Sequence, residues 1–438
     1  MQTAAYISAL YIYNIYFHPL RTYPGPKLFA AYRTPYVYNQ LRGRLPLRAK
    51  ELHDLYGPVV RIAPDELSYI TAPAWKDIFG FRPGHSQLPK DLIIFPPLRQ
   101  GQSADIARSD DANHSRQRRL LSHAFSKKAL EEQHSMIISY VDLLVRRLHE
   151  NAAKPQDLMA WYNWTTFDII GNLAFGESFS CLEDQRFHPW VKTILVSING
   201  GVAISAARRY GLGNLLVRLI PKSTIEKFEL LHSYAKEKIA RRLERGTERP
   251  DFMSHMMRND HDRKEMSQSE IESTAVTIVI AGSETTAALL SGATYHLMMN
   301  PKLLRQVSEE VRNAFLSEKD IDCTTVGKLE FLSAVLKESL RIYPPAPSSM
   351  PRKVIGKGGD FIDGKWVPPN VSGCVLFVSD IWHGEYITED WRRLFHSRNV
   401  HSETTQLTLN QRTDYCRPFP MGLQPLCFKL PRPRLLPP

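Results

Sequence analysis

The sequence predicts a mainly α-helical protein with a small β region. Apolar residues recur at helical spacing along most of the chain, strand signals are few and local, and one helical pattern runs uninterrupted for about thirty residues. With 438 residues, of which 43% are hydrophobic, the chain can bury the core of one large domain or of two ordinary ones.

Composition argues against several classes of protein. The five cysteines are scattered and form no CxxC pair, so they indicate neither a disulfide framework nor a zinc site, and we expect a reducing compartment. The net charge of +11 comes from basic residues that are interleaved with acidic ones. We therefore expect no nucleic-acid partner, and a basic surface that suits anionic membranes or acidic proteins.

The first stretch, residues 1–20, carries no formal charge and is rich in Tyr, Ile and Leu. About 17 apolar-leaning residues lie at the lower limit for crossing a bilayer, and the tyrosines suit a membrane interface. We predict an N-terminal membrane-associated segment at 1–20 and a catalytic domain at 21–438, joined by a stiff proline-rich connection. A buried first helix is the alternative.

Local signals place the ordinary elements in order. Residues 59–70 and 361–368 each predict a short hairpin, the second with an Asp-Gly turn. Apolar residues at helical spacing predict a helix within 122–150. Another helix is expected from Pro301, with Asn300 as its N-cap, because proline is well tolerated in the first helical turn.

One helix is unusual. Ser267 and Glu270 have capping-box spacing, and the pattern after them runs to Asn300 without proline. Its middle is apolar on all sides until "AGSETT" places Gly282, Glu284 and two threonines where a buried helix prefers hydrocarbon. In one interpretation a threonine bonds back to the preceding turn while the glutamate lies at the surface. In the other, this stretch forms a groove beside a cofactor, where an acid and an alcohol manage protons.

Two further patterns concern charged groups. Glu338 and Arg341 are three apart on a helix that ends at Pro344, so they lie on one face and can pair, either at the surface or as a buried pair. His114 and Arg118 are four apart in a basic stretch. They predict either an anion-binding face or a solvated helix start.

The order of these motifs resembles the cytochrome P-450 family of haem-thiolate monooxygenases: "AGSETT" in a long helix, "ESLR" followed by "YPP", and a terminal Phe, Gly and Cys. "FHPLRTYPGP", "YGPVVRIAPDEL" and "FDIIGNLAFGESF" resemble the fungal secondary-metabolism branch, including isotrichodermin C-15 hydroxylase. Specific motifs cover about residues 12–371. The resemblance implies a P-450 fold that is incomplete in its C-terminal part, with a degenerate tail at 372–438.

The resemblance implies a role for the unusual residues of the long helix. Ala281 and Gly282 match the distal helix beside the haem, where the glycine opens an oxygen pocket. Glu284 and Thr285 match the acid-alcohol pair that delivers protons before O–O cleavage. These two residues are the expected catalytic residues.

The resemblance also implies haem-binding and structural residues. His114 and Arg118 match a helix that binds a haem propionate, although many members have tryptophan where this chain has histidine, and Arg352 matches another propionate-facing position. Glu338 and Arg341 match a buried structural ion pair. The implied substrate pocket is lined near Phe95, Ile204, Val279 and 346–349.

The cysteine loop departs from the family pattern Phe-x-x-Gly-x-Arg-x-Cys-x-Gly. The chain keeps Phe419 and Gly422 but has Gln424 for the arginine and Leu426 for the cysteine, and Cys427, the expected iron ligand, comes one position late. One extra residue moves a sulfur by about 3 Å or more, whereas metal coordination tolerates a few tenths of an ångström. Eleven residues follow Cys427, where family members continue into a further helix. A shifted reading frame or a retained intron near the C-terminus is the hypothesis that these departures suggest.

The resemblance implies a membrane-associated monooxygenase that inserts one oxygen atom from O2 into a small apolar secondary metabolite of terpenoid or polyketide type. Its cofactor would be haem (iron protoporphyrin IX), and its electrons would come from NADPH through a reductase. Its place would be the cytosolic face of the endoplasmic reticulum membrane. Two alternatives stay open: an inactive or truncated relative without correctly ligated haem, and a helical membrane-surface binding protein.

Overall fold

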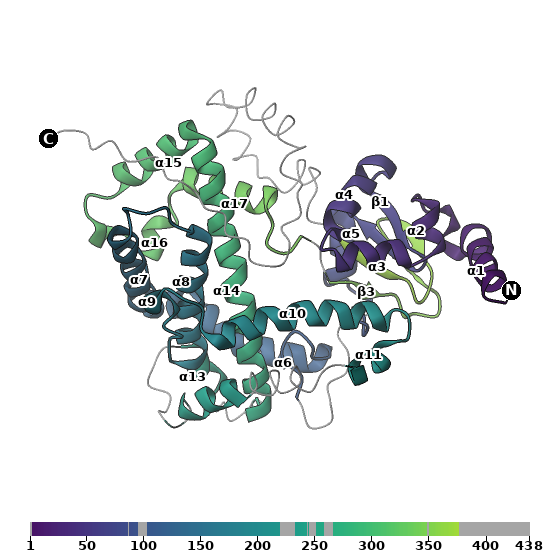
Figure 1. Cartoon of the computed structure of the whole chain (residues 1–438), viewed down its shortest axis with the longest axis horizontal. Coiled ribbons are helices and arrows are strands. Elements are labelled where there is room, and N and C mark those ends of the chain that lie inside the picture. Colours follow the sequence, from purple (N-terminus) through teal and green to yellow (C-terminus); the bar gives the residue numbers. More distant parts are fainter. Residues whose placement is uncertain are drawn as a thin grey trace. The chain divides into compact units, whose positions relative to one another are not determined.

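The computed structural model describes residues 2–85, 87–94, 103–219, 233–242, 244, 251–257, 266–347 and 350–375. Two compact units are present. Unit 1 comprises the described residues within Met1–Pro97, Gly200–Leu219 and Leu340–Leu423, and unit 2 comprises those within Leu98–Asn199 and Ile220–Ser339. Helices dominate and the strands gather in unit 1 (Figure 1), so the predicted fold class, mainly α with a small β region, is confirmed.

Unit 1 holds the strands. The predicted hairpin at 59–70 is confirmed as β1 (Val59–Ala63) and β2 (Glu66–Tyr69), which pair antiparallel. β6 (Ser372–Val375) lies parallel to β2 and antiparallel to β3 (Arg352–Lys353), so the sheet order is β1-β2-β6-β3. The helical segments of this unit are α1 (Gln2–Ile12), a π-helix (Tyr13–Phe17), a 3-10 helix (Pro19–Thr22), α2 (Lys27–Ala31), α3 (Thr34–Leu41), α4 (Leu45–Tyr56), α5 (Ala72–Phe79), the last part of α10 (Pro189–Arg208) and α11 (Gly213–Leu219).

The second predicted hairpin is formed by β4 (Asp360–Ile362) and β5 (Lys365–Val367). Its two turn residues, Asp363 and Gly364, have φ angles of 53° and 70°. Positive φ at both positions is what a tight two-residue hairpin turn requires, and an Asp-Gly pair adopts it at low cost. The sequence signal and the turn therefore agree.

The N-terminal segment is fixed to unit 1 through its second half. The Asn14 side chain donates a 2.7 Å hydrogen bond to the Ala31 carbonyl, and Arg61 Nη1 donates to the Asn14 carbonyl at 2.9 Å. Its large apolar side chains are 49% to 67% exposed, namely Tyr6, Ile7, Ile12, Tyr13, Tyr16 and Phe17. The alternative of a buried first helix is therefore wrong, and the domain boundary at residue 20 stays a prediction.

Every regular element among the described residues of unit 2 is a helix. Its elements are α6 (Asp111–Ser122), a 3-10 helix (His123–Phe125), α7 (Lys127–Glu150), α8 (Leu158–Phe175), α9 (Cys181–Asp184), the first part of α10, α13 (Phe252–Met256), α14 (Gln268–Met299), α15 (Pro301–Ala314), a 3-10 helix (Glu318–Asp320), α16 (Cys323–Val326) and most of α17 (Glu330–Ile342). The helices predicted within 122–150 and from Pro301 are confirmed as α7 and α15.

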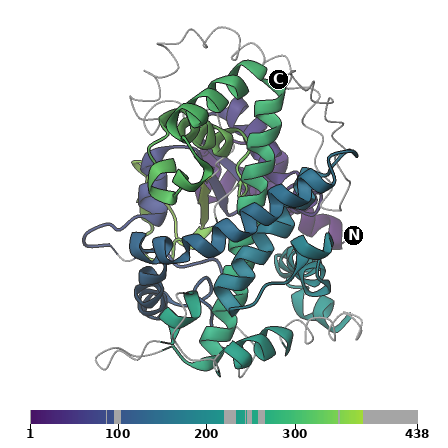
Figure 2. The ribbon, with the colours of Figure 1, turned by 90° about the vertical axis from the view of Figure 1, so that its left-hand side faces the viewer.

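Helix α14 is the long helix that the sequence predicts. Its capping box is present, with the Ser267 and Glu270 side chains each accepting from the other's backbone N–H. It packs along α8 in the core of unit 2, where Val276 and Val279 are buried, and both views show it extending through that unit (Figures 1 and 2). Within the described ranges it is the one helix long and apolar enough to cross a membrane, and 33% of its apolar stretch is buried inside the protein.

Candidate active site

The centre of α14 presents an exposed polar face. Ala281, Glu284 and Thr285 are exposed, whereas Ser283 between them is fully buried. The Thr285 hydroxyl donates a 2.6 Å hydrogen bond to the Ala281 carbonyl, one turn earlier. This is the back-bonding of the first interpretation, and it also leaves the lone pairs of the Thr285 oxygen available on the exposed face, as the second interpretation requires.

Burial raises the pKa of the Glu284 carboxyl group, because desolvation disfavours its charged form. Solvent nevertheless reaches this side chain, so water moderates the desolvation. A carboxyl group with a raised pKa keeps its proton closer to neutral pH and can donate it to a neighbour. Such perturbed groups are typical of functional sites, although structural sites contain them as well.

Gly282 makes room for a neighbouring helix. A Cβ at this position would lie 2.7 Å from Cδ1 of Ile170 in α8, so the glycine allows the two helices to pack closely. The expected role of Gly282 beside an oxygen pocket stays a prediction. The space beside its Cα is filled by Ile170, while the exposed face of α14 is formed by Ala281 and Thr285.

Helix α6 carries the two residues expected to bind a propionate. Arg118 is exposed and has no hydrogen-bond or ion-pair partner among the residues that the structure describes, and His114, one turn earlier, is half-buried. Arg116, by contrast, donates to the carboxylate of Glu270 in α14 and to Asn113. Arg118 is thus open to an anionic ligand, and its role with His114 stays a prediction.

Arg352 lies in β3 of unit 1. Its Nη1 donates to the Leu88 carbonyl at 3.2 Å, and its guanidinium lies 5.7 Å from the centroid of the Phe79 ring. These contacts attach Arg352 to the end of α5 and to the segment around Leu88, both in unit 1. Its contact with a propionate stays a prediction.

Glu338 and Arg341 lie one turn apart on α17, both half-buried. Glu338 is close enough to His296 of α14 to act on its pKa, which burial lowers and the carboxylate of Glu338 raises, with burial the larger effect. Glu338 therefore faces the C-terminal end of the long helix. The ion pair with Arg341 stays a prediction.

Several predicted positions fall outside the described residues. They are Phe95, two residues within 346–349, and the whole cysteine loop with Phe419, Gly422 and Cys427. Of the other expected pocket residues, Ile204 is half-buried in α10. Val279 is fully buried in the core of unit 2, which corrects its assignment to the substrate pocket.

The buried thiols of the described residues are unsuited to bind iron. Burial raises the pKa of both Cys181 and Cys374 to about 12, so each is a neutral thiol at physiological pH. Across the parts of the chain that the structure describes, no group of three or more His, Cys, Asp or Glu residues could hold a metal ion. A thiolate ligand from either buried position would require local unfolding.

The described side chains fit the distal side and the propionate edge of a haem. An exposed helix face that carries a hydroxyl group suits the side on which O2 is handled, and an exposed guanidinium suits a propionate. Ala281, Thr285 and Arg118, all in unit 2, are the residues that would hold these two parts of the cofactor.

Two contacts in unit 2 were not predicted from the sequence. Glu270 pairs with Arg116, which is 154 positions away, and Glu310 of α15 accepts hydrogen bonds from the first backbone N–H groups of α17. The capping box marked Glu270 as structurally important. No sequence signal marked its partner or Glu310, because both contacts form only when distant helices pack.

Known proteins are similar to this chain over most of its length. Residues 31–368 match the profile of the family described as Cytochrome P450. Cytochrome P450 monooxygenase astA of Talaromyces wortmannii is 43% identical over 369 residues, which cover 83% of this chain and 74% of that protein. Averantin hydroxylase of Aspergillus parasiticus is 40% identical over 394 residues, which cover 88% of this chain and 79% of that protein.

A third relative, Cytochrome P450 monooxygenase astJ of Aspergillus oryzae, is 39% identical over 422 residues and covers 95% of this chain and 82% of its own length. The predicted enzyme class, an oxidoreductase, is confirmed, and haem is the cofactor of this family. The narrower likeness to isotrichodermin C-15 hydroxylase stays a prediction. The family profile and these relatives together establish that the chain belongs to the cytochrome P450 family.

Proposed function

We propose that this chain is a haem-thiolate monooxygenase that hydroxylates a small apolar secondary metabolite of terpenoid or polyketide type. The observation that carries the proposal is the exposed Thr285 hydroxyl, which donates to the Ala281 carbonyl. The next residue along the chain on its N-terminal side, Glu284, has a carboxyl group whose pKa burial raises. Relatives named as monooxygenases support oxygen insertion, and a relative named averantin hydroxylase favours hydroxylation as its outcome.

The overall reaction consumes the substrate, O2, two electrons and two protons, and yields the alcohol and water. Haem iron with a thiolate ligand, when bound, supplies the activation of O2. The chain itself manages the protons. Thr285 donates its own hydrogen to the Ala281 carbonyl, which orients the hydroxyl oxygen as an acceptor on the exposed face. Glu284 supplies a carboxyl group beside this face; because burial raises its pKa, it takes up a proton more readily than an ordinary surface glutamate and can pass that proton on.

The electrons come, in this proposal, from NADPH through a reductase. The net charge of +11 supports an acidic redox partner, because opposite charges steer association. Residues 1–20 supply the contact with the cytosolic face of the endoplasmic reticulum membrane. Sixteen residues of α1 and the π-helix would span only about 24 Å as an α-helix, so we propose that they lie in the interface.

The cysteine loop supports a second candidate function, a P450 relative that does not bind haem correctly. Leu426 stands where the family has the iron ligand, and Gln424 replaces the arginine. An absorption spectrum of the purified chain, reduced and treated with carbon monoxide, separates the two candidates. The Soret position of a thiolate-ligated haem supports the monooxygenase, and any other spectrum supports the inactive relative. A chain whose cysteine loop is restored to the family pattern is the matched control.

Catalysis by the acid-alcohol pair is tested with Thr285→Ala and Thr285→Ser in a chain that shows the thiolate spectrum. Loss of the hydroxyl removes proton delivery, so we expect at least a tenfold smaller fraction of the consumed NADPH to yield alcohol, the remainder yielding hydrogen peroxide or water. Thr285→Ser keeps the hydroxyl and should retain most of the yield. Equal product yields from Thr285→Ala and the unchanged chain would contradict the proposed role.

The orientation at the membrane is tested with acceptor sites that the chain already contains. Asn113 and Asn370 are exposed and begin the glycosylation patterns Asn-His-Ser and Asn-Val-Ser. In a eukaryotic host, we expect neither to be glycosylated, because the cytosolic face lacks the modifying enzyme. A chain preceded by a cleavable secretory signal is the control that shows the sites to be competent. Glycosylation of the unchanged chain would contradict the cytosolic orientation.

A further inference from the structure

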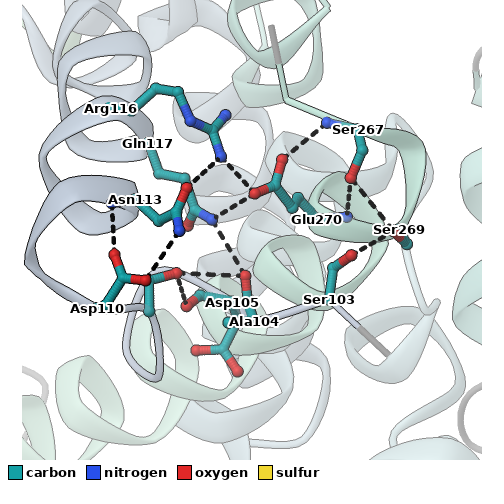
Figure 3. A network of polar contacts seen from close by, with 11 residues as sticks. Ser103, Ala104, Asp105, Asp110, Asn113, Arg116, Gln117, Ser267, Ser269 and Glu270 are labelled. Atoms are coloured by element: carbon teal, nitrogen blue, oxygen red, sulfur yellow. Dashed lines mark hydrogen bonds and ion pairs between the residues drawn. The ribbon is translucent and has the colours of Figure 1, made fainter. Parts of the chain in front are cut away.

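A polar network joins the start of α14 to one face of α6. Arg116 donates to Glu270 Oε1, and Gln117 Nε2 donates to the same oxygen at 3.2 Å. The other carboxylate oxygen accepts the Ser267 N–H at 2.8 Å, which closes the capping box. Figure 3 shows Arg116 and Gln117 converging on Glu270 from the same helix.

The network also holds the loop that leads into α6. Gln117 Nε2 donates to the Ala104 carbonyl at 3.1 Å, and the hydroxyls of Ser103 and Ser269 lie 2.6 Å apart. Asp110 caps α6 by accepting the Asn113 N–H at 2.8 Å. Loop, helix α6 and the first turn of α14 are therefore connected through side chains as well as through backbone packing (Figure 3).

Burial alone would raise the pKa of Glu270, but hydrogen bonds from Arg116, the Ser267 N–H and Gln117 outweigh burial and lower it. Its carboxylate is thus charged at neutral pH. The side chains of Arg116 and Glu270 are 21% and 14% exposed, so protein surrounds most of the ion pair. Water and salt therefore screen it less than they screen an exposed pair. This arrangement restricts rotation of α6 about its axis.

Arg118 lies two positions after Arg116, which corresponds to a rotation of about 200° around the helix. The exposed guanidinium of Arg118 therefore projects from the side of α6 that faces away from Glu270. Arg116 and Gln117 bind one side of the helix to Glu270, and Gln117 also binds the Ala104 carbonyl, so they determine where the opposite side points.

We propose that Glu270 is a positioning residue, which through Arg116 and Gln117 holds α6 in the rotation that directs Arg118 to a carboxylate of the bound porphyrin. The inference rests on the proposed haem function and on the resemblance to the family, which assigns Arg118 to a haem propionate. Glu270 itself touches neither the cofactor nor the substrate. Its charge, rather than its contribution to the capping box, is what sets the direction of Arg118.

The test uses metal-free protoporphyrin IX and its dimethyl ester, whose binding requires no iron ligand. The ester replaces two charged carboxylates by neutral methyl esters, so the change in the ratio of the two dissociation constants between the unchanged chain and Arg118→Gln reports contact with a cation. Fluorescence titration of the full chain gives this ratio. We expect the unchanged chain to prefer the free acid about tenfold, as one charge-assisted hydrogen bond would provide, and Arg118→Gln to lose the preference. Arg119→Gln, which removes an exposed charge from the same helix, should keep it.

Glu270→Gln keeps an acceptor for the capping box, which tolerates glutamine, but removes the charge that Arg116 requires. We expect Glu270→Gln to lose most of the preference for the acid. Arg116→Gln removes the other partner of the same ion pair and should lose the preference to the same extent. Ser267→Ala weakens the capping box while leaving the ion pair in place, and should keep the preference although it lowers the melting temperature.

If Arg118→Gln loses the preference but Glu270→Gln and Arg116→Gln both keep it, the positioning role is overturned and the propionate site stands. Equal binding of acid and ester by the unchanged chain would remove the propionate role of Arg118, and the positioning role with it. Loss of the preference in Ser267→Ala at a temperature where that variant is folded would assign the effect to the helix start rather than to the ion pair, and would also overturn the inference.

Discussion

Gly282 determines, at the scale of one residue, how closely two helices approach. Its sequence context resembles the glycine of an oxygen pocket, and its actual neighbour is Ile170 of α8. The two helices form the main packing of unit 2, so even one added methyl group should be felt. The distinction between the two roles is measurable, because only the packing role predicts a loss of stability in the protein without cofactor.

Gly282→Ala should lower the free energy of unfolding. Alanine gains about 1 kcal/mol in helix propensity, but its Cβ would lie 2.7 Å and 3.0 Å from two carbons of Ile170, and such overpacking costs about 1–3 kcal/mol. We expect a net loss of about 1 kcal/mol in urea unfolding. The matched control is Gly201→Ala in α10, whose Cβ would meet nothing within 4 Å and which should be neutral or stabilising. Equal stability of the two variants would contradict the packing role.

His53 is a buried histidine whose two ring nitrogens are both bonded. Nδ1 lies 2.8 Å from the Gly57 carbonyl, and Nε2 lies 2.8 Å from the Ser68 hydroxyl. In the neutral tautomer Nδ1 donates to the carbonyl and Nε2 accepts from Ser68. Burial lowers the pKa of His53 below its ordinary value of 6.5, although the hydrogen bond to the Gly57 carbonyl and the charge of Asp54 oppose that shift.

The stability of the protein should therefore fall on the acidic side of pH 6.5. Below that pH the unfolded chain binds a proton at His53 before the folded chain does, so stability that is present above pH 6.5 is lost as pH falls toward the lowered pKa. Unfolding free energies measured from pH 7.5 to 5 should decrease less steeply in His53→Gln than in the unchanged chain. The control His123→Gln, at an exposed position, should leave the slope unchanged. Identical slopes in all three would rule out the effect.

The ends of helices and strands in this fold are stabilised either by residues close in the chain or by side chains of distant elements. Only the first kind is visible in the sequence. The Ser267–Glu270 capping box and the Asp363–Gly364 turn involve neighbours in the chain, so their signals were sufficient and both predictions are confirmed. Helix α17 begins differently, because its first N–H groups are satisfied by a side chain of another helix. Glu310 accepts the Phe331 N–H at 2.9 Å and the Leu332 N–H at 2.8 Å.

Glu310→Ala should destabilise unit 2 by about 1–3 kcal/mol, because it leaves two N–H groups at the start of α17 without their acceptor. Glu310→Gln retains one acceptor oxygen and should lie between the alanine variant and the unchanged chain. Glu309→Ala, at the exposed neighbouring position on α15, should change the free energy of unfolding by less than about 0.5 kcal/mol. Chemical denaturation followed by circular dichroism measures all three. A Glu310→Ala variant as stable as Glu309→Ala would show that water replaces this cap without cost.

At the scale of the whole molecule, sequence patterns predicted the fold class, both hairpins and the long helices, because periodicity and turn chemistry act locally. They did not predict contacts that join distant segments. Glu66 of β2 is buried with Arg209, 143 positions later, and nothing in either neighbourhood marks the pair. The same limit applies to the site. Motifs drew attention to Thr285 and Arg118, whereas the packing of Gly282 depends on α14 meeting α8, and the partner of Arg116 depends on α14 meeting α6.

The distribution of thiols over the molecule provides the last prediction. Cys181 and Cys374 belong to different units, yet both are buried and have a pKa of about 12. At pH 7 only about one part in 100,000 of each would be thiolate. A brief treatment of the folded protein with iodoacetamide should leave both unmodified, as peptide mass spectrometry can show, and the same treatment in denaturant should modify both.

The labelling result bears on where an iron ligand can come from. If haem binds through a thiolate, Cys181→Ala and Cys374→Ala should keep the spectrum of the reduced, carbon monoxide-treated protein, while Cys427→Ala should lose it. Rapid labelling of Cys374 in the folded protein would contradict its burial in the sheet of unit 1. A thiolate spectrum that survives Cys427→Ala but disappears in Cys374→Ala would reassign the ligand to β6, where the folded structure holds a neutral thiol against the Leu67 carbonyl.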